Sequence, residues 1–131
     1  MYFSDTALQT EYTGLNDKHV EMWRKYVDAC QKHGTPTIVQ VSHPGRQSLR
    51  RAGNRGSFAQ TIAPSALPLK IGISWLDSLL TYLAFLQPRE MTQKHINTVT
   101  RLFVDTTSLM ADSEFSGIEL HKAHGYLMHK Q

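Results

Sequence analysis

The chain has 131 residues, about half of the roughly 250 that a complete eight-stranded α/β barrel needs, so we expect at most one hydrophobic core. Apolar residues make up 40% of the chain and charged residues 19%, a globular composition that argues against a disordered chain. The formal charge of +3 comes partly from Arg46, Arg50, Arg51 and Arg55, and the rest of the chain is nearly balanced. We therefore expect no nucleic-acid partner.

The cysteine content and the apolar stretches indicate where the chain acts. Cys30 is the single cysteine and cannot form an intrachain disulfide, which fits a reducing compartment. Residues 1–11 are polar and do not have the pattern of a secretory signal. The most apolar stretch, 71–86, is interrupted by polar residues and is shorter than the roughly 20 residues that cross a bilayer. We expect a cytoplasmic chain with no membrane span.

The first predicted elements are a helix over residues 16–33 and a strand over residues 37–41. In the helix, apolar residues recur at helical spacing, namely Val20, Trp23, Val27 and Cys30. Gly34 suits its C-terminal end. The strand is apolar and β-branched with little alternation, which is typical of a strand buried on both faces of a parallel sheet.

A long loop is predicted next, over residues 46–69, because this segment is rich in Arg, Gly, Ser, Pro and Ala and has no clear periodicity. We expect a turn at Gly53-Asn54 within it. Loops of this length in compact domains are often functional.

Two helices and a second strand complete the predicted elements. Ser74 with Asp77 forms a capping pair for a helix over residues 74–86, whose apolar stripe consists of Leu76, Leu79, Leu80 and Leu83. Thr92 caps a helix that ends before the turn-like segment 112–117, and residues 117–121 form a strand. The order of elements is that of βαβ units, which predicts an α/β fold with a parallel sheet and crossover helices.

Polar side chains follow both predicted strands directly. Gln40 and His43 lie at the end of the first strand, and His121, His124 and Tyr126 lie at the end of the second. In parallel α/β folds, ligands gather at the carboxyl ends of the strands. The placement of these residues therefore favours a functional site.

His121, His124 and Tyr126 have the chemistry of a site that binds a conjugated carbonyl compound during hydride addition. His121 and His124 are three residues apart, and each imidazole can donate a hydrogen bond to the same carbonyl oxygen. Two such donors would stabilise the negative charge that develops on the oxygen when hydride adds to a conjugated carbon. Tyr126 is placed to supply the proton.

Other interpretations of these residues remain open. The histidines could be hydrogen-bonded structural residues, and together with His129 they are potential zinc ligands. Because there is no HExxH motif and no cysteine partner, we do not expect a metal site. The Gln40 amide suits the donor and acceptor edge of a flavin, or it is a satisfied polar residue in the sheet. Glu119 shares a strand face with His121, and we identify no obvious strand partner for its carboxylate.

The arginines of the predicted loop could bind phosphate or RNA, the interpretation that we rank last. They lack interleaved aromatic residues and any nucleic-acid motif, so we expect a solvated loop.

Four blocks of the sequence resemble, in order, the old yellow enzyme family. They are Val39-Gln40-Val41-Ser42-His43-Pro44-Gly45-Arg46-Gln47, Ala63-Pro64-Ser65-Ala66, Pro88-Arg89-Glu90-Met91-Thr92 and Gly117-Ile118-Glu119-Leu120-His121-Lys122-Ala123-His124-Gly125-Tyr126-Leu127. The resemblance runs from about Gly14 to the end of the chain and corresponds to roughly the second to fourth β/α units. The family's opening strands, its later flavin-contacting arginine and its phosphate-binding loops have no counterpart in this sequence.

The resemblance implies a partial (β/α)8 TIM barrel, with residues 1–131 as a single partial domain. It implies an FMN-dependent NAD(P)H oxidoreductase that reduces activated alkenes such as enones. In that family Gln40 would contact the flavin, His121 and His124 would bind the substrate carbonyl oxygen, and Tyr126 would donate the proton. We expect the isolated chain to be inactive and to self-associate through exposed apolar surface. The alternative is a non-catalytic α/β interaction module.

Overall fold

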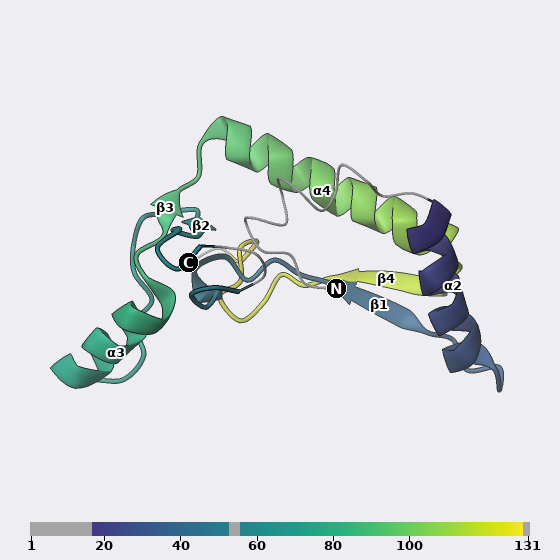
Figure 1. Cartoon of the computed structure of the whole chain (residues 1–131), viewed down its shortest axis with the longest axis horizontal. Helices are drawn as coiled ribbons and strands as arrows, with labels where there is room; N and C mark the ends of the chain where they lie inside the picture. The colour runs from purple at the N-terminus through teal and green to yellow at the C-terminus, as the bar shows by residue number, and fades with distance from the viewer. Residues whose placement is uncertain (1–16, 53–55, 130–131) are drawn as a thin grey trace.

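The computed structural model describes residues 17–52 and 56–129. Its elements, in chain order, are α2 (Asp17–Gln31), β1 (Ile38–Val41), η1 (Gly45–Gln47), β2 (Ile62–Ala63), α3 (Trp75–Phe85), β3 (Arg89–Glu90), α4 (Gln93–Asp112) and β4 (Gly117–Leu120) (Figure 1). The helices and the two longer strands lie where the sequence pattern predicts them. The α/β fold is therefore confirmed.

β1 and β4 form a two-stranded parallel sheet, although 75 positions separate Val41 from Gly117 in the numbering, since the register pairs Ile38 with Gly117 and Val41 with Leu120. α4 is the helix of the crossover, and it lies along one face of this sheet (Figure 1). This is the parallel arrangement with a crossover helix that the order of elements predicted. The structure contains only part of a barrel, because its main sheet has two strands within the described residues.

Two hydrophobic clusters hold α4 against the sheet. At one end, Val39 packs with Leu109 and Met110, and α2 adds Val20 and Trp23. At the other end, residues of the sheet, of α4 and of the C-terminal segment pack together, namely Val41, Ile62, Val99, Phe103 and Leu127. Each cluster joins residues that are distant in the sequence, so together they position the ends of β1 and β4.

The first strand, whose sequence is typical of burial on both faces, is buried on one face only within the described residues. Val39 and Val41 are buried, but Ile38 is 65% exposed and Gln40 is exposed as well. The reason is that α2 and α4 cover only the face that bears Val39 and Val41. A strand reaches two-sided burial only when a second layer covers it, and the described residues supply no such layer on the Gln40 face.

The prediction of one continuous loop over residues 46–69 is also wrong. The single-turn helix η1 (Gly45–Gln47) overlaps its start, and β2 (Ile62–Ala63) pairs in parallel with β3 (Arg89–Glu90). Strands of two residues are too short to show alternation, so the sequence pattern could not indicate them. The expected turn at Gly53-Asn54 lies outside the described residues.

The capping predictions are confirmed at both later helices. Ser74 Oγ accepts a hydrogen bond from the Asp77 backbone N–H at 3.1 Å, and the Ser74 N–H donates to Asp77 Oδ2 at 3.1 Å. At α4, Thr92 Oγ1 accepts from the His95 N–H, and the Thr92 N–H donates to His95 Nδ1 at 3.2 Å. Each pair of reciprocal hydrogen bonds forms a capping box, and in the box at α4 the His95 imidazole takes the place of the usual carboxylate or amide.

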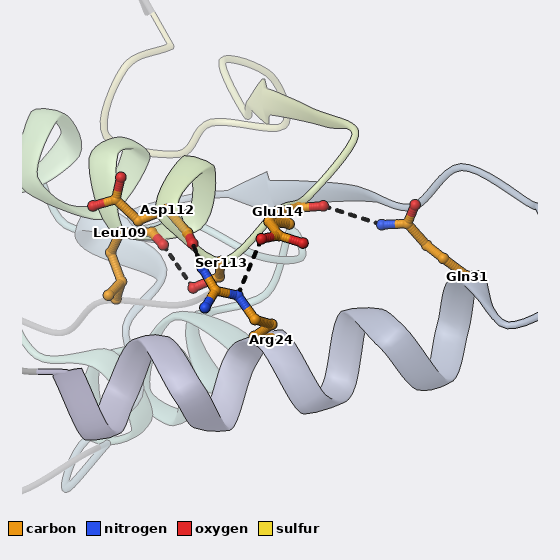
Figure 2. A network of polar contacts seen from close by, with 6 residues as sticks. All are labelled: Arg24, Gln31, Leu109, Asp112, Ser113 and Glu114. Carbon is orange, nitrogen blue, oxygen red and sulfur yellow. Dashed lines mark hydrogen bonds and ion pairs between the residues drawn. The ribbon is translucent and has the colours of Figure 1, made fainter.

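Polar contacts fix α2 against the end of α4 (Figure 2). Arg24 donates to the Asp112 carbonyl at 2.8 Å and pairs with the Glu114 carboxylate at 3.3 Å. Gln31, at the other end of α2, donates to the Glu114 carbonyl at 3.1 Å. Ser113 is buried and donates to the Leu109 carbonyl at 2.7 Å, which closes the end of α4. These contacts set the turn from which β4 begins.

α3 extends away from the rest of the molecule (Figure 1). Its apolar side chains are largely exposed, among them Trp75 (78%) and Leu80 (57%), with Leu76, Leu79 and Leu83 close to half exposed. The expected exposure of this stripe is confirmed. In the part of the chain that the structure describes, no helix is both long and apolar enough to span a membrane.

Candidate functional site

The polar segments that follow β1 and β4 lie side by side. The His121 N–H donates to the Val41 carbonyl at 2.9 Å and extends the β1–β4 ladder by one bond. Further along, the Leu127 N–H donates to the His43 carbonyl at 3.0 Å. The carboxyl ends of the two strands therefore meet at one edge, and the structure brings both predicted clusters together there.

The two histidine rings are in direct contact. His124 Nδ1 and His121 Nε2 are 3.3 Å apart, and the ring centroids are 5.2 Å apart. In a hydrogen-bonded neutral pair, one of these nitrogens donates and the other accepts. The two nitrogens are therefore close enough to reach a common oxygen.

Tyr126 lies against the same histidine. Its ring is 4.7 Å from the His121 ring, centroid to centroid, at an interplanar angle of 68°, which is an edge-on contact. Both side chains are partly exposed, and His124 is exposed. The structure therefore gathers all three predicted residues at the end of β4.

A tight turn sets the direction of this segment. His124 has a φ of 57° and Gly125 a φ of 74°, so two successive residues adopt the left-handed conformation. That conformation is uncommon for any residue other than glycine. The Gln47 amide donates to the His124 carbonyl at 2.5 Å and holds the turn from the β1 side. Sequence patterns did not assign Gln47 this role, because the contact spans 77 residues.

Buried hydrogen bonds support the turn at His124 and Gly125, which we call the histidine turn. They begin at His43, which is 2% exposed. The Gly45 N–H donates to His43 Nδ1 at 3.0 Å, and Thr61 Oγ1 donates to the Gly45 carbonyl at 2.8 Å. Gly45 has a φ of 56°, and a Cβ at this position would lie 3.1 Å from Leu127 Cα. Only glycine therefore allows the His43 turn to pack this closely against the segment that carries the site.

Gln40 and Glu119 contact one another on the exposed face of the sheet. Gln40 Nε2 donates to Glu119 Oε1 at 3.0 Å, and the two residues are opposite in the strand register. The expectation that Glu119 has no strand partner is therefore wrong. Its partner could not be recognised from sequence, since it depends on the register between two distant strands.

The arginine loop is more structured than expected. Arg46 is only 7% exposed and donates to Ser65 Oγ at 3.1 Å. Arg50 donates to the Ser57 and Leu83 carbonyls, and its guanidinium lies 5.2 Å from the Phe58 ring centroid. The prediction of a solvated loop is wrong for these two residues, because their guanidinium groups hold the loop together.

The described residues contain no group of three or more histidine, cysteine, aspartate or glutamate side chains placed to hold a metal ion.

The histidine and tyrosine side chains thus lie at the carboxyl end of a strand, where parallel α/β folds bind their ligands. A sequence profile of the NADH:flavin oxidoreductase / NADH oxidase family matches residues 5–131, and the chain belongs to this family. The resemblance to the old yellow enzymes is thereby confirmed. The cofactor of the family is FMN, with NADH or NADPH as the hydride donor.

Individual relatives agree with this assignment. The chain is 43% identical over 123 residues to the NADH-dependent flavin oxidoreductase iliE of Neonectria sp., covering 94% of this chain and 16% of that protein. It is 40% identical over 125 residues to the NADH-dependent flavin oxidoreductase iccE of Talaromyces variabilis, covering 95% of this chain and 30% of that protein. The old yellow enzyme from Trypanosoma cruzi superposes with a TM-score of 0.65 at 28% identity, covering 92% of this chain and 37% of that one. The chain thus spans less than a third of each of the two flavin oxidoreductases, iliE and iccE.

Proposed function

We propose that this chain supplies the substrate-oxygen site of an FMN-dependent NAD(P)H oxidoreductase that reduces activated alkenes such as enones. The observation that carries the proposal is the contact between His121 and His124, whose nitrogens are 3.3 Å apart beside the Tyr126 ring. FMN, when bound, supplies the hydride that adds to the alkene carbon.

The histidines bind and polarise the substrate in this proposal. The substrate carbonyl oxygen replaces the contact between the two rings and accepts a hydrogen bond from each. Because negative charge grows on that oxygen during reduction, the two bonds are stronger in the transition state than in the substrate. Gln47, which holds the His124 carbonyl, keeps the turn in place while the rings move.

Tyr126 is the proton donor in this proposal. Its edge-on contact with His121, the residue proposed to bind the carbonyl oxygen, supports this role. From this position its hydroxyl would deliver a proton to the carbon that does not receive the hydride.

Gln40 is the residue that fits a flavin. Its amide lies on the exposed face of β1, and an amide can both donate to and accept from the flavin ring edge. Glu119 fixes the amide orientation, because an ionised carboxylate only accepts hydrogen bonds and Nε2 must therefore face it. One such neutral contact contributes about 1 kcal/mol, whereas micromolar affinity needs about 8 kcal/mol.

We propose, for this reason, that the isolated chain neither holds FMN stoichiometrically nor reduces an enone. A hollow of about 460 Å³, lined by residues of α2 and β1 that include Tyr26 and Gln40, lies beside β1, consistent with a neighbouring strand in the complete barrel. Equilibrium dialysis with FMN, followed by an anaerobic NADPH assay, tests this. A yellow one-to-one complex that bleaches on reduction would contradict it.

The substrate role is tested in a chimaera, in which this chain replaces the matching segment of the Talaromyces variabilis relative. His124→Ala should weaken binding of a phenolate ligand about tenfold or more, since charge-assisted hydrogen bonds contribute about 1.5–3 kcal/mol. FMN affinity should stay unchanged. Lys122→Ala, at an exposed neighbouring position, is the control. Unchanged phenolate affinity in His124→Ala would exclude the proposed role.

The second candidate function is a non-catalytic α/β interaction module, and the exposed apolar face of α3 favours it. An apolar surface of this kind drives association, so we propose that the isolated chain self-associates. Sizing chromatography over a range of concentrations should show oligomers, and Leu80→Glu should shift them toward monomer. A monomer at high concentration would rule out this association.

The free, exposed thiol of Cys30 supports a reducing, cytoplasmic location.

A further inference from the structure

The contact between His121 and His124 has the dimensions of a metal chelate. In a tetrahedral zinc site, with Zn–N distances of about 2.0–2.1 Å, neighbouring ligand nitrogens are roughly 3.3 Å apart. His121 Nε2 and His124 Nδ1 are 3.3 Å apart. We infer that these two nitrogens form a bidentate site for a divalent transition-metal ion such as Zn²⁺.

The pair is accessible and its backbone is held in place. His124 is exposed and His121 partly exposed, so an ion reaches both rings from solvent. The His121 N–H is tied to the Val41 carbonyl, and the His124 carbonyl is tied to Gln47. Because the backbone is fixed on both sides, binding has to order little more than two imidazole rings, which favours chelation.

The chemistry of the pair selects the type of ion and the strength of binding. Imidazole suits zinc, copper and nickel, whereas magnesium and calcium take oxygen ligands. The site has two protein ligands, and water completes the coordination. It is therefore weaker than the three-ligand centres of zinc enzymes and different from the three-histidine site considered from the sequence.

Metal binding has a consequence for the proposed reaction, and this consequence alone rests on the proposed function. A nitrogen that coordinates a metal ion has no proton to donate to a carbonyl oxygen. Zn²⁺ at these two nitrogens therefore excludes the two hydrogen bonds to the substrate oxygen on which the proposed function depends.

The test is a titration of the full chain with ZnCl₂. Calorimetry measures the binding, and the histidine ring resonances in NMR spectra report which histidines take part. The key variant is His124→Asn. An asparagine amide still donates to an oxygen but ligates zinc poorly, and asparagine tolerates the left-handed φ of this position. His33→Ala, at an exposed histidine outside the site, is the matched control.

We expect one Zn²⁺ per wild-type chain with shifts at His121 and His124, no comparable binding of Mg²⁺, and at least tenfold weaker zinc binding in His124→Asn. His33→Ala should bind zinc like the wild type. The inference is overturned if wild type and His124→Asn bind zinc equally, or if the resonance shifts fall on other histidines. Phenolate binding in the chimaera is measured separately. If His124→Asn loses zinc binding and retains phenolate binding, both ideas stand. If the wild-type chain binds zinc but the chimaera with the wild-type histidines does not bind phenolate, only the proposed function is removed.

Discussion

Gln40 donates from Nε2 to Glu119 Oε1 at 3.0 Å, across the parallel pairing of β1 with β4. Both residues are exposed, so we expect Glu119→Ala to lower the free energy of unfolding by about 0.5–1 kcal/mol, the usual contribution of a hydrogen bond. The side-chain amide resonances of Gln40 should shift in the same variant. Glu90→Ala, an exposed glutamate of β3, should leave those resonances where they are. Unmoved Gln40 resonances in Glu119→Ala would show that the contact is absent in solution.

The two capping boxes should differ in their effect on stability. α4 packs in both hydrophobic clusters, so Thr92→Ala should destabilise the whole fold by about 1 kcal/mol. α3 buries only Thr81, so Ser74→Ala should loosen that helix and leave global unfolding nearly unchanged. Urea unfolding measures the first effect, and amide hydrogen exchange within α3 measures the second. Equal losses of global stability would mean that α3 is part of the main cooperative unit.

Acid should loosen α3 before the rest of the fold. The Ser74 backbone N–H, which donates to the Asp77 carboxylate, lowers the pKa of Asp77 below its usual value of 3.8, and the Ser74 hydroxyl adds to the effect. A lowered pKa in the folded state stabilises the helix above pH 3.8, and this contribution is lost as the pH falls through the folded-state pKa. Chemical shifts of α3 amides between pH 6 and pH 2 should report the loss. Asp77→Asn should abolish this dependence, and a profile identical to wild type would contradict the assignment.

Gly45→Ala should disturb the candidate site without altering any histidine. The new Cβ would lie 3.1 Å from Leu127 Cα, and the φ of 56° is unfavourable for alanine. We expect a loss of about 1–3 kcal/mol, typical of a strained backbone residue, together with shifted resonances for His121 and His124. Gly56→Ala is the matched control, because a Cβ added at Gly56 would meet nothing within 4 Å. Similar stabilities for the two variants would argue against the close packing.

Features that depend on neighbouring residues along the chain could be predicted from sequence. Ser74 and Thr92 each act on a residue three positions later, and both capping interactions occur as predicted. The placement of His121 and His124 after a strand was predictable for the same reason. Their contact is also local, and the sequence indicated that the rings converge.

Features that depend on distant segments could not be predicted. Ile38 has the character of a buried strand residue, but its burial depends on a layer that the described residues do not provide. The Gln40–Glu119 contact depends on strand register, and the burial of Arg46 depends on Ser65 in a loop without periodicity. In each case the burial or the partner of the side chain was set by tertiary structure.

α4 contributes Val99 and Phe103 to one hydrophobic cluster and Leu109 and Met110 to the other. With 20 residues it is about 30 Å long, so a single helix joins the two hydrophobic clusters. Neither cluster can open without displacing this helix from the other. Hydrogen exchange at β1 and at the histidine turn should therefore proceed through one shared opening event, while α3, which lies outside both clusters, opens on its own.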